Sequence, residues 1–313
     1  MREPRGDTLK AGGGMGCPER TALPEVIAIF GPTASGKTAV AEAVADRLGT
    51  TVVSADAMQV YRGLPILTNQ PKRPSRLVAI RELSDEMSVA EYAELAHEAI
   101  DDLVARTGGA VVAGGTGLYL RAALVDLHVP PRPPEGVRER WERMYDADSA
   151  RAHSRLAELD PEAAARVHPN DRRRIVRALE LAELGSSLVP SSGRLWSDEV
   201  RRPTLLAGLD VPTAILEDRI RSRVVDMVER GALKEARSAR SGPLSRTAAR
   251  ALGIRELTEL PLAEAIELLG ARTIRYAAYQ RKWMRRVPGI VMIDADRSPE
   301  EVADALLEVA RAR

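Results

Sequence analysis

The sequence is organised around the stretch Gly31-Pro32-Thr33-Ala34-Ser35-Gly36-Lys37-Thr38, which fits the phosphate-binding pattern G-x-x-x-x-G-K-[ST]. An apolar run, 26–30, comes directly before it and predicts a buried parallel strand, and the alanine-rich run 39–48 predicts a helix directly after it. In this order the backbone N–H groups of the loop and of the helix start converge on one point and attract a polyanion. Lys37 adds a positive charge, and the Thr38 hydroxyl is placed to bind Mg²⁺. The motif predicts a pyrophosphate site without saying which reaction follows; the alternative is a glycine-rich turn with a chance lysine.

The composition limits the class of protein. The chain has 313 residues, of which 44% are hydrophobic, and this suits one large domain or a core with an insertion. The 46 basic and 45 acidic residues nearly cancel, so any basic surface must be local. The single Cys17 excludes an internal disulfide and a cysteine metal cluster. Since no apolar run approaches a membrane span and no signal-like segment starts the chain, we predict a soluble cytoplasmic protein with a disordered tail over 1–23.

A second predicted strand, 51–54, is followed closely by Asp56. In open α/β sheets ligands bind beyond the carboxyl ends of the strands, so this carboxylate is expected on the same rim as the phosphate loop. It is a candidate for holding metal-bound phosphates or for acting as a general base. Its alternative role is to cap a turn or helix.

Further elements of an α/β core follow along the chain. The run 77–80 predicts a third strand, and Ser88 with Glu91 predicts a capping box that opens a helix. A strand over 110–113 leads into the block Gly114-Gly115-Thr116-Gly117-Leu118-Tyr119, where a phosphate-loop ATPase often has an Asp that holds the metal. The glycines are interpreted as letting a ligand approach the backbone, and Thr116 as offering its hydroxyl to an oxygen that gains charge. A plain strand-to-helix turn is the alternative.

From Pro130 the sequence becomes proline-rich and then helical, rich in Arg and Glu, up to a Ser/Gly/Pro stretch that ends near 193. We interpret 131–200 as a helical insertion domain. Within it Asp171 is placed to cap a helix whose arginines, from Arg172 onward, form a basic front without a matching acidic run. Such a front suits a phosphate backbone, although charge runs are usually solvated faces.

The chain then returns to core elements. A strand over 204–209, a helix from Pro212, a helix over 271–286, a strand over 289–293 and a helix over 298–312 are predicted. The predicted fold class is therefore α/β: a parallel sheet like that of P-loop NTPases, flanked by helices, with the core formed by 24–130 and 201–313 and the insertion by 131–200.

Four blocks of the sequence together resemble the tRNA dimethylallyltransferases. Any one of them is a weak signal, but all four occur in the family's order and at its spacing over about 26–283. They are the phosphate loop 31–38, Ser54-x-Asp56-x-x-Gln59-x-Tyr61-x-Gly63, the block 114–119, and His168-Pro169-Asn170-Asp171 with Arg174 and Arg177-Ala178-Leu179-Glu180.

The resemblance implies a reaction and a role for particular residues. The family transfers a dimethylallyl group from dimethylallyl diphosphate to N6 of adenosine 37, beside the anticodon, in tRNAs that read codons beginning with U. Asp56 is implied as the general base, Thr116 as a group near the bridging oxygen, and Arg223, with Arg219 as its nearest rival, as a diphosphate ligand. The family further implies Mg²⁺ on Thr38, and base 37 flipped out of the anticodon stem-loop. The implied diphosphate-binding residues are Gly31, Pro32, Thr33, Ala34, Ser35, Gly36, Lys37 and Thr38, and the implied tRNA-binding residues are Asp56, Ala57, Met58, Gln59, Thr116, Arg138, Asn170, Asp171, Arg172, Arg173, Arg174, Arg250, Gly253 and Arg255.

The chain departs from the family pattern in four places, which bear on tRNA contacts more than on the chemistry. They are Leu67-Thr68-Asn69-Gln70 for Gly-Thr-Ala-Lys, Pro74-Ser75-Arg76 for Pro-His-His, Gly253-Ile254 for Gly-Tyr, and Tyr279-Gln280 for Arg-Gln. Two other classes are considered: a small-molecule kinase that uses ATP at the same loop, and a non-catalytic RNA-binding ATPase. The missing metal-holding Asp and the block 114–116 argue against both. With no dimerising stripe in the sequence, a monomer is expected.

Overall fold

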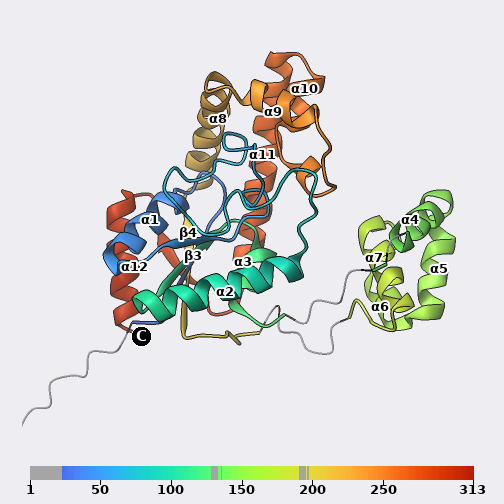
Figure 1. The fold of residues 1–313 in the computed structure, drawn as a ribbon, viewed down its shortest axis with the longest axis horizontal. Coiled ribbons are helices and arrows are strands. Elements are labelled where there is room, and N and C mark those ends of the chain that lie inside the picture. The colour runs from blue at the N-terminus through green and yellow to red at the C-terminus, as the bar shows by residue number, and fades with distance from the viewer. Residues whose placement is uncertain (1–22, 128–132, 135, 190–194, 196) are drawn as a thin grey trace, which may run out of the picture.

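A five-stranded parallel sheet forms the centre of the protein (Figure 1). The computed structural model describes residues 23–127, 133–134, 136–189, 195 and 197–313. The predicted tail 1–23 lies outside these residues except for Leu23. The sheet has the order β2-β3-β1-β4-β5, with the strands β1 (Val26–Phe30), β2 (Val52–Ser54), β3 (Ala110–Gly114), β4 (Thr204–Asp210) and β5 (Val291–Asp294).

The central strand β1 pairs with β3 on one side and β4 on the other. Phe30, its last residue, is opposite Gly114 and Gly208. Every residue of β1 is buried, which explains why its sequence is a continuous apolar run rather than an alternating one. Since all strands are parallel, their carboxyl ends and the loops that follow them meet at one edge of the sheet.

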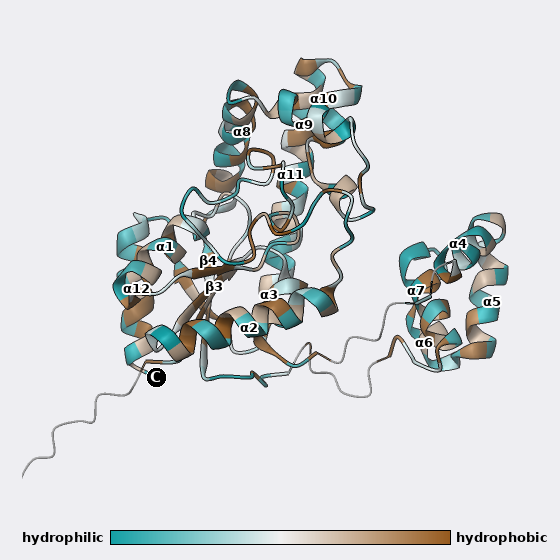
Figure 2. Ribbon diagram, in the orientation of Figure 1, coloured by the Kyte–Doolittle hydropathy of each residue, from teal (hydrophilic) through white to brown (hydrophobic). Residues whose placement is uncertain are grey.

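Helices cover both faces of the sheet. Ile27 and Ile29 pack with helices α1 (Lys37–Leu48) and α12 (Pro299–Arg311) on one face. Ala28 and Phe30 pack on the other face with α2 (Val89–Thr107) and α3 (Gly117–Leu124). Hydrophobic residues are concentrated in β3, β4 and the sides of the helices that face them (Figure 2). The predicted fold class is confirmed.

A second group of helices lies over the carboxyl edge of the sheet (Figure 1). It contains α8 (Thr213–Glu229), α9 (Ala232–Arg240), α10 (Ile254–Glu259) and α11 (Leu262–Met284). The sequence analysis predicted neither α9 nor α10, and it began the last helix of this group at 271. That helix begins nine residues earlier because Pro261 serves as its N-cap, with Leu262 as its first residue.

Four helices form the region predicted as an insertion: α4 (Val137–Ala147), α5 (Ser149–Leu159), α6 (Pro161–Arg166) and α7 (Arg172–Glu183). They pack around their own apolar cluster, which includes Trp141, Leu156, Ile175 and Leu179. Asp171 caps α7 as expected, since its side chain accepts a hydrogen bond from the backbone N–H of Arg174 at 3.1 Å. An ion pair of 2.6 Å links Glu139 of this group to Arg246 of the main part of the chain.

The predicted strand at 77–80 is wrong. Leu77 and Ala79 have φ angles of 62° and 52°, in the left-handed region that a strand cannot contain. Only isolated bridges flank the segment, Val53 to Arg76 and Tyr61 to Arg81. The segment is therefore part of a long loop, 55–87, that lies over the carboxyl edge of the sheet.

Candidate active site

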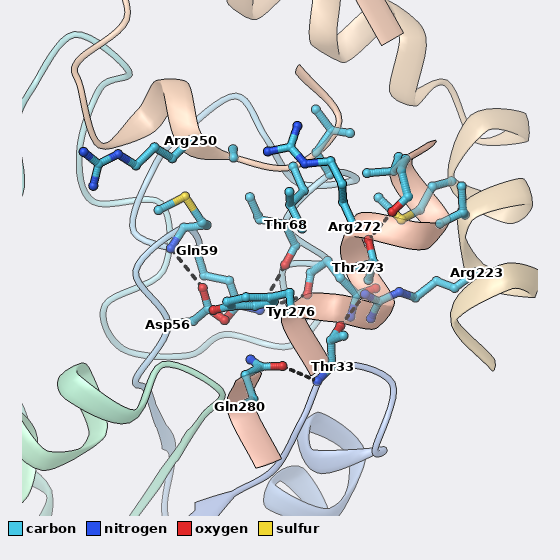
Figure 3. Close-up of a pocket in the computed structure, with 18 of the residues that line it drawn as sticks. Thr33, Asp56, Gln59, Thr68, Arg223, Arg250, Arg272, Thr273, Tyr276 and Gln280 are labelled. Carbon is cyan, nitrogen blue, oxygen red and sulfur yellow. Dashed lines mark hydrogen bonds between the residues drawn. The ribbon is translucent and has the colours of Figure 1, made fainter. Parts of the chain in front are cut away.

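A cavity of about 520 Å³ opens where the strand ends meet the second helical group (Figure 3). It collects residues from the phosphate loop, the loop after β2, α8 and α11. Its lining is Thr33, Lys37, Thr38, Asp56, Met58, Gln59, Leu67, Thr68, Asn69, Arg223, Val224, Met227, Arg250, Ala251, Leu252, Leu269, Arg272, Thr273, Arg275, Tyr276 and Gln280.

The phosphate loop has the backbone of an anion cradle. Ala34 and Gly36 both have positive φ, at 65° and 83°, and α1 begins directly after them at Lys37. Successive N–H groups in such a loop point to its inside, where the helix dipole also favours negative charge. The Thr33 N–H is already bound, because it donates to the side-chain oxygen of Gln280 at 2.8 Å.

Two partly buried cations, Lys37 and Arg223, lie beside this loop. Burial lowers the pKa of Lys37 to about 8, a net value in which the negative charge of Asp56 opposes the shift and the positive charge of Arg223 adds to it. Burial also lowers the pKa of Arg223, whose guanidinium donates to the Thr33 hydroxyl. The Nε atom of Arg223 is buried without a hydrogen-bond partner. Partly buried cationic groups with unused donors form a site for an anion of more than one charge.

Asp56 and Thr116 lie on the same rim, as predicted. One carboxylate oxygen of Asp56 accepts a hydrogen bond from the Met58 N–H at 2.9 Å. The Ala57 N–H donates to the Thr116 hydroxyl at 3.3 Å, and Thr116 is the N-cap residue of α3. Asp56 thus fixes a turn and also lines the cavity, where its carboxylate faces the cationic pair.

Gln59 orders the long loop above the site. Its amide nitrogen donates to the carbonyl oxygens of Thr68 and Asn69, and its oxygen accepts from Ser54. The Gln70 side chain in turn donates to the carbonyl of Gln59 at 3.2 Å. The loop is held by its own side chains, as a functional loop without regular structure requires.

The glycines after β3 have another role than the predicted one. A Cβ atom at Gly114 would lie 2.0 Å from the Ala55 carbonyl oxygen, and one at Gly115 would lie 2.3 Å from the Gln280 amide nitrogen. At Gly117 it would lie 2.3 Å from the Trp283 ring. The space beside each glycine is therefore filled by protein. These glycines let the loop after β2 and helix α11 pack closely against β3, so the space that their missing side chains leave is filled by protein and not by a ligand.

The predicted tRNA-binding residues of the core divide into two groups. Met58, Gln59 and Arg250 line the cavity with Asp56. The other group does not line it and consists of Ala57, Thr116, Gly253 and Arg255. Gly253 has a φ of 101° and a Cβ there would lie 2.5 Å from Leu67, while Arg255 is exposed in an ion pair with Glu259 at 2.8 Å.

In the helical insertion the arginines are more often paired than the sequence analysis expected. Arg172 forms an ion pair with Asp146 of α4 at 2.7 Å, which raises its pKa. Arg138 pairs with Glu142 at 3.3 Å, and Arg174 lies 3.6 Å from Asp171. The expectation of a basic front without matching acids fails at Arg172, because α4 supplies its acidic partners across the bundle. Asn170 precedes the helix, where its N–H donates to His168 at 3.1 Å.

The positive charges of the two parts meet near the cavity mouth. Burial lowers the pKa of Arg250, and the positive charges of Arg173 and Arg138 lower it further. Cations that repel one another in this way are stabilised by an anion placed between them. Arg219, the rival of Arg223, does not line this cavity. It lines an adjoining one of about 320 Å³, together with Arg223 and residues of the phosphate loop, and it pairs with Asp296 at 3.3 Å.

Helix α11 supplies functional candidates to which the sequence analysis gave no role. Leu269, Thr273, Tyr276 and Gln280 all line the cavity and are spaced three or four residues apart, so they share one face of the helix. The sequence signal that could have identified them is this stripe of mostly polar residues, whose first and last members, Leu269 and Gln280, are buried. Gln280 joins two motifs, since it accepts from the Thr33 N–H and donates to the Gly115 carbonyl at 2.8 Å.

A metal site composed of protein side chains alone is absent from the described part of the chain, where no group of three or more His, Cys, Asp and Glu residues converges. The Thr38 hydroxyl lines the cavity beside Lys37, with the Asp56 carboxylate on the same wall. Oxygen donors of this kind suit Mg²⁺, which usually binds through one or two protein groups and the phosphates of a substrate. Among the described residues no helix is long and apolar enough to cross a membrane.

Comparisons with known proteins identify similar chains over nearly the whole length. Residues 59–287 match the model of the family described as IPP transferase. A tRNA dimethylallyltransferase of Anaeromyxobacter sp. is 43% identical over 293 residues, which cover 87% of this chain and 96% of that one. One of Salinispora arenicola is 40% identical, covering 92% of this chain and 87% of the other.

Solved structures similar to this chain come from the same kind of enzyme. The tRNA isopentenylpyrophosphate transferase of Bacillus halodurans is 32% identical, with a TM-score of 0.65 and coverage of 91% of this chain and 95% of that one. A eukaryotic dimethylallyltransferase described as acting on tRNA is 26% identical, with a TM-score of 0.70 and coverage of 86% and 73%.

Proposed function

Because this chain belongs to the IPP transferase family and is a tRNA dimethylallyltransferase, we propose that its cavity is where a dimethylallyl group passes from dimethylallyl diphosphate to N6 of adenosine 37 of a tRNA. The observation that carries this assignment is the convergence of Lys37, Arg223 and the phosphate loop beside Asp56 in one cavity. This convergence supports a diphosphate site next to a proton acceptor. The tRNAs we expect to be modified read codons that begin with U.

The cavity has a charged part and an apolar part, which suit the two parts of dimethylallyl diphosphate. The diphosphate fits the loop with its two partly buried cations. The apolar wall fits a branched five-carbon chain, and it consists of Leu67, Val224, Met227, Ala251, Leu252 and Leu269. An apolar wall of this kind suits a hydrocarbon group that is itself transferred.

The reaction breaks the C–O bond between the allylic carbon and the diphosphate and forms a bond from that carbon to N6. The lone pair of N6 is delocalised into the adenine ring, so the amine becomes a useful nucleophile only as it loses a proton. Asp56 is our general base for that proton. Charge that develops on the leaving diphosphate is stabilised by Lys37, Arg223 and the loop amides, with Thr116 near the bridging oxygen. Mg²⁺, held through Thr38 and the diphosphate, would neutralise part of that charge.

The tRNA would lie across the cavity mouth and the helical insertion. The positive group formed by Arg138, Arg173 and Arg250 supports a contact with the phosphate backbone. Base 37 must leave the anticodon loop to reach Asp56. The kinase alternative is not favoured, because the relatives are tRNA dimethylallyltransferases.

The test is transfer of labelled dimethylallyl from its diphosphate to an anticodon stem-loop with A36-A37-A38, in the presence of Mg²⁺. Replacing Asp56 by Asn keeps an acceptor for the turn but removes the base, and the rate should fall on the order of 10²–10⁴-fold. Asp304→Asn, an exposed carboxylate on α12 paired with Arg47, is the matched control and should leave the rate unchanged. Full activity of the Asp56→Asn enzyme would rule out Asp56 as the general base. If the unaltered enzyme transfers nothing to either the stem-loop or full tRNA, tRNA is ruled out as the acceptor.

We further expect a monomer that works in the cytoplasm. Light scattering of the purified protein, alone and with one equivalent of tRNA, tests the oligomeric state. A mass of two chains in the free protein would contradict it.

A further inference from the structure

Tyr276 is the one aromatic residue among those that line the cavity in the described part of the chain. It projects from α11, and 36% of the residue is exposed although its helix is packed against the rest of the site. Aromatic residues make up only 3% of this sequence. A tyrosine ring left open inside a reaction cavity is therefore an unusual use of a scarce residue type.

The ring is placed beside the proposed base. In Figure 3 Tyr276 extends from α11 toward Asp56, and its pKa is raised mainly by burial and further by the negative charge of Asp56. The Thr116 and Gln280 side chains lie near enough to the hydroxyl to oppose that rise in pKa. Gln280 is itself fixed by the phosphate loop and by Gly115. The ring thus lies among residues that hold the reaction site together.

We infer that the ring of Tyr276 is the surface on which the flipped adenine stacks while its N6 amine faces Asp56, an inference that rests on the proposed function. A base that leaves the anticodon loop loses its stacking partners, and proteins usually replace them with an aromatic side chain. An adenine whose N6 reaches the Asp56 carboxylate occupies the space next to that carboxylate, and the neighbouring wall there is the Tyr276 ring. The hydroxyl then serves to position the ring and does not contact the base.

A different use of the ring would be to stabilise positive charge on the allylic carbon. The two uses differ in kinetics. A stacking surface acts when the tRNA binds, so its loss raises the KM and Kd for the stem-loop. A cation stabiliser acts only in the transition state, so its loss lowers kcat and leaves both affinities unchanged.

The experiment compares Tyr276→Leu, which removes the ring, with Tyr276→Phe, which removes only the hydroxyl. Stacking on one aromatic ring predicts a loss of stem-loop affinity on the order of 5- to 150-fold for the Leu variant. We expect little change for the Phe variant, and an unchanged KM for dimethylallyl diphosphate in both. Leu262→Ala, an exposed position at the start of the same helix and outside the cavity lining, is the control.

A stem-loop with 2-aminopurine at position 37 gives a readout that does not depend on catalysis. Its fluorescence should be quenched in saturated complexes with the unaltered and Phe proteins and should be brighter with the Leu protein. Unchanged affinity and fluorescence in the Leu variant would overturn the inference, as would a fall in kcat alone. If the unaltered protein binds the stem-loop with quenching but transfers nothing, the proposed reaction fails while the stacking site stands; if it binds neither stem-loop nor tRNA, both fail.

Discussion

The buried amine of Lys37 predicts how diphosphate binding changes with pH. Its pKa in the free protein is lowered to about 8, mainly by burial. Only the protonated amine attracts a diphosphate, so the affinity for dimethylallyl diphosphate or for inorganic pyrophosphate should fall as the pH rises through 8. An exposed lysine, with a pKa near 10.4, would show no such change below pH 10.

The size of the effect follows from the protonated fraction. With a pKa of about 8, roughly nine in ten Lys37 side chains are protonated at pH 7 and roughly one in ten at pH 9. The apparent affinity should therefore weaken about tenfold over this range, because only the charged fraction binds. The terminal phosphate of dimethylallyl diphosphate loses its last proton near pH 6, as a phosphate monoester does, so this ligand changes little in charge between these limits.

The assay is titration of pyrophosphate into the free enzyme at constant free Mg²⁺, at half-unit steps from pH 7 to pH 9, together with kcat/KM for dimethylallyl diphosphate. Lys37→Gln is the comparison: it should bind weakly at every pH, with a flat profile. A flat profile in the unaltered protein, or an equal slope in Lys37→Gln, would refute the argument from burial.

Loss of the Lys37 proton weakens diphosphate binding but raises the free energy of unfolding, so the two measurements should change in opposite directions. The folded pKa lies below the unfolded value of 10.5, so between about pH 8 and 10.5 the unfolded chain holds more protons than the folded one. The contribution of Lys37 to the free energy of unfolding thus rises with pH across that window, by up to about 3 kcal/mol. Urea unfolding of the free protein and of Lys37→Gln should differ in this pH dependence, while diphosphate binding weakens in the same range.

Three further predictions concern packing and RNA binding. Gly117→Ala should lower the free energy of unfolding by about 1–3 kcal/mol in a urea titration, because its Cβ would meet the Trp283 ring, whereas Gly242→Ala, with nothing within 4 Å, should leave stability nearly unchanged. Gln280→Leu should cost about 1–3 kcal/mol in the same assay and also weaken pyrophosphate binding, because a phosphate-loop amide and a buried carbonyl lose their partner. Arg173→Ala should weaken tRNA binding alike for all sequences and reduce the slope of log Kd against log salt by about 1, and an unchanged slope would exclude a phosphate contact.

The parts of the fold that sequence alone predicted are those specified by neighbouring residues. The strand, loop and helix around Lys37 follow one another within about 23 residues, and each is stabilised by its own pattern: an apolar run, glycines at special backbone angles, and helix formers. The cap at Asp171 is local in the same way. The failed strand at 77–80 shows the limit, since its apolar composition suited a strand but the positive φ angles of Leu77 and Ala79 are imposed by distant packing.

The site was predictable where it follows strand ends and unpredictable where it depends on contacts across the chain. Asp56 and Thr116 come after two neighbouring strands, and the parallel sheet brings them together. The hydrogen bond from the Thr33 N–H to the Gln280 side chain joins residues 247 positions apart, and no local pattern in either segment specifies it. The acidic partners of Arg172 were missed for the same reason, because they lie on another helix.

Helix α11 explains why a phosphate loop of ordinary sequence serves a prenyl transfer. The loop, with α1 and Lys37, would hold the phosphates of a nucleotide equally well, and nothing within it selects the chemistry. Selection comes from the face of α11 that closes over it: Gln280 ties the helix to the loop, and Leu269 contributes to an apolar wall opposite the cations. The glycines after β3 permit this close approach, since any side chain at Gly115 would collide with Gln280. The glycine block that follows β3 and the helix α11 therefore depend on each other. Glycine, which stands where an ATPase has its metal-holding Asp, is required here by packing as much as by chemistry.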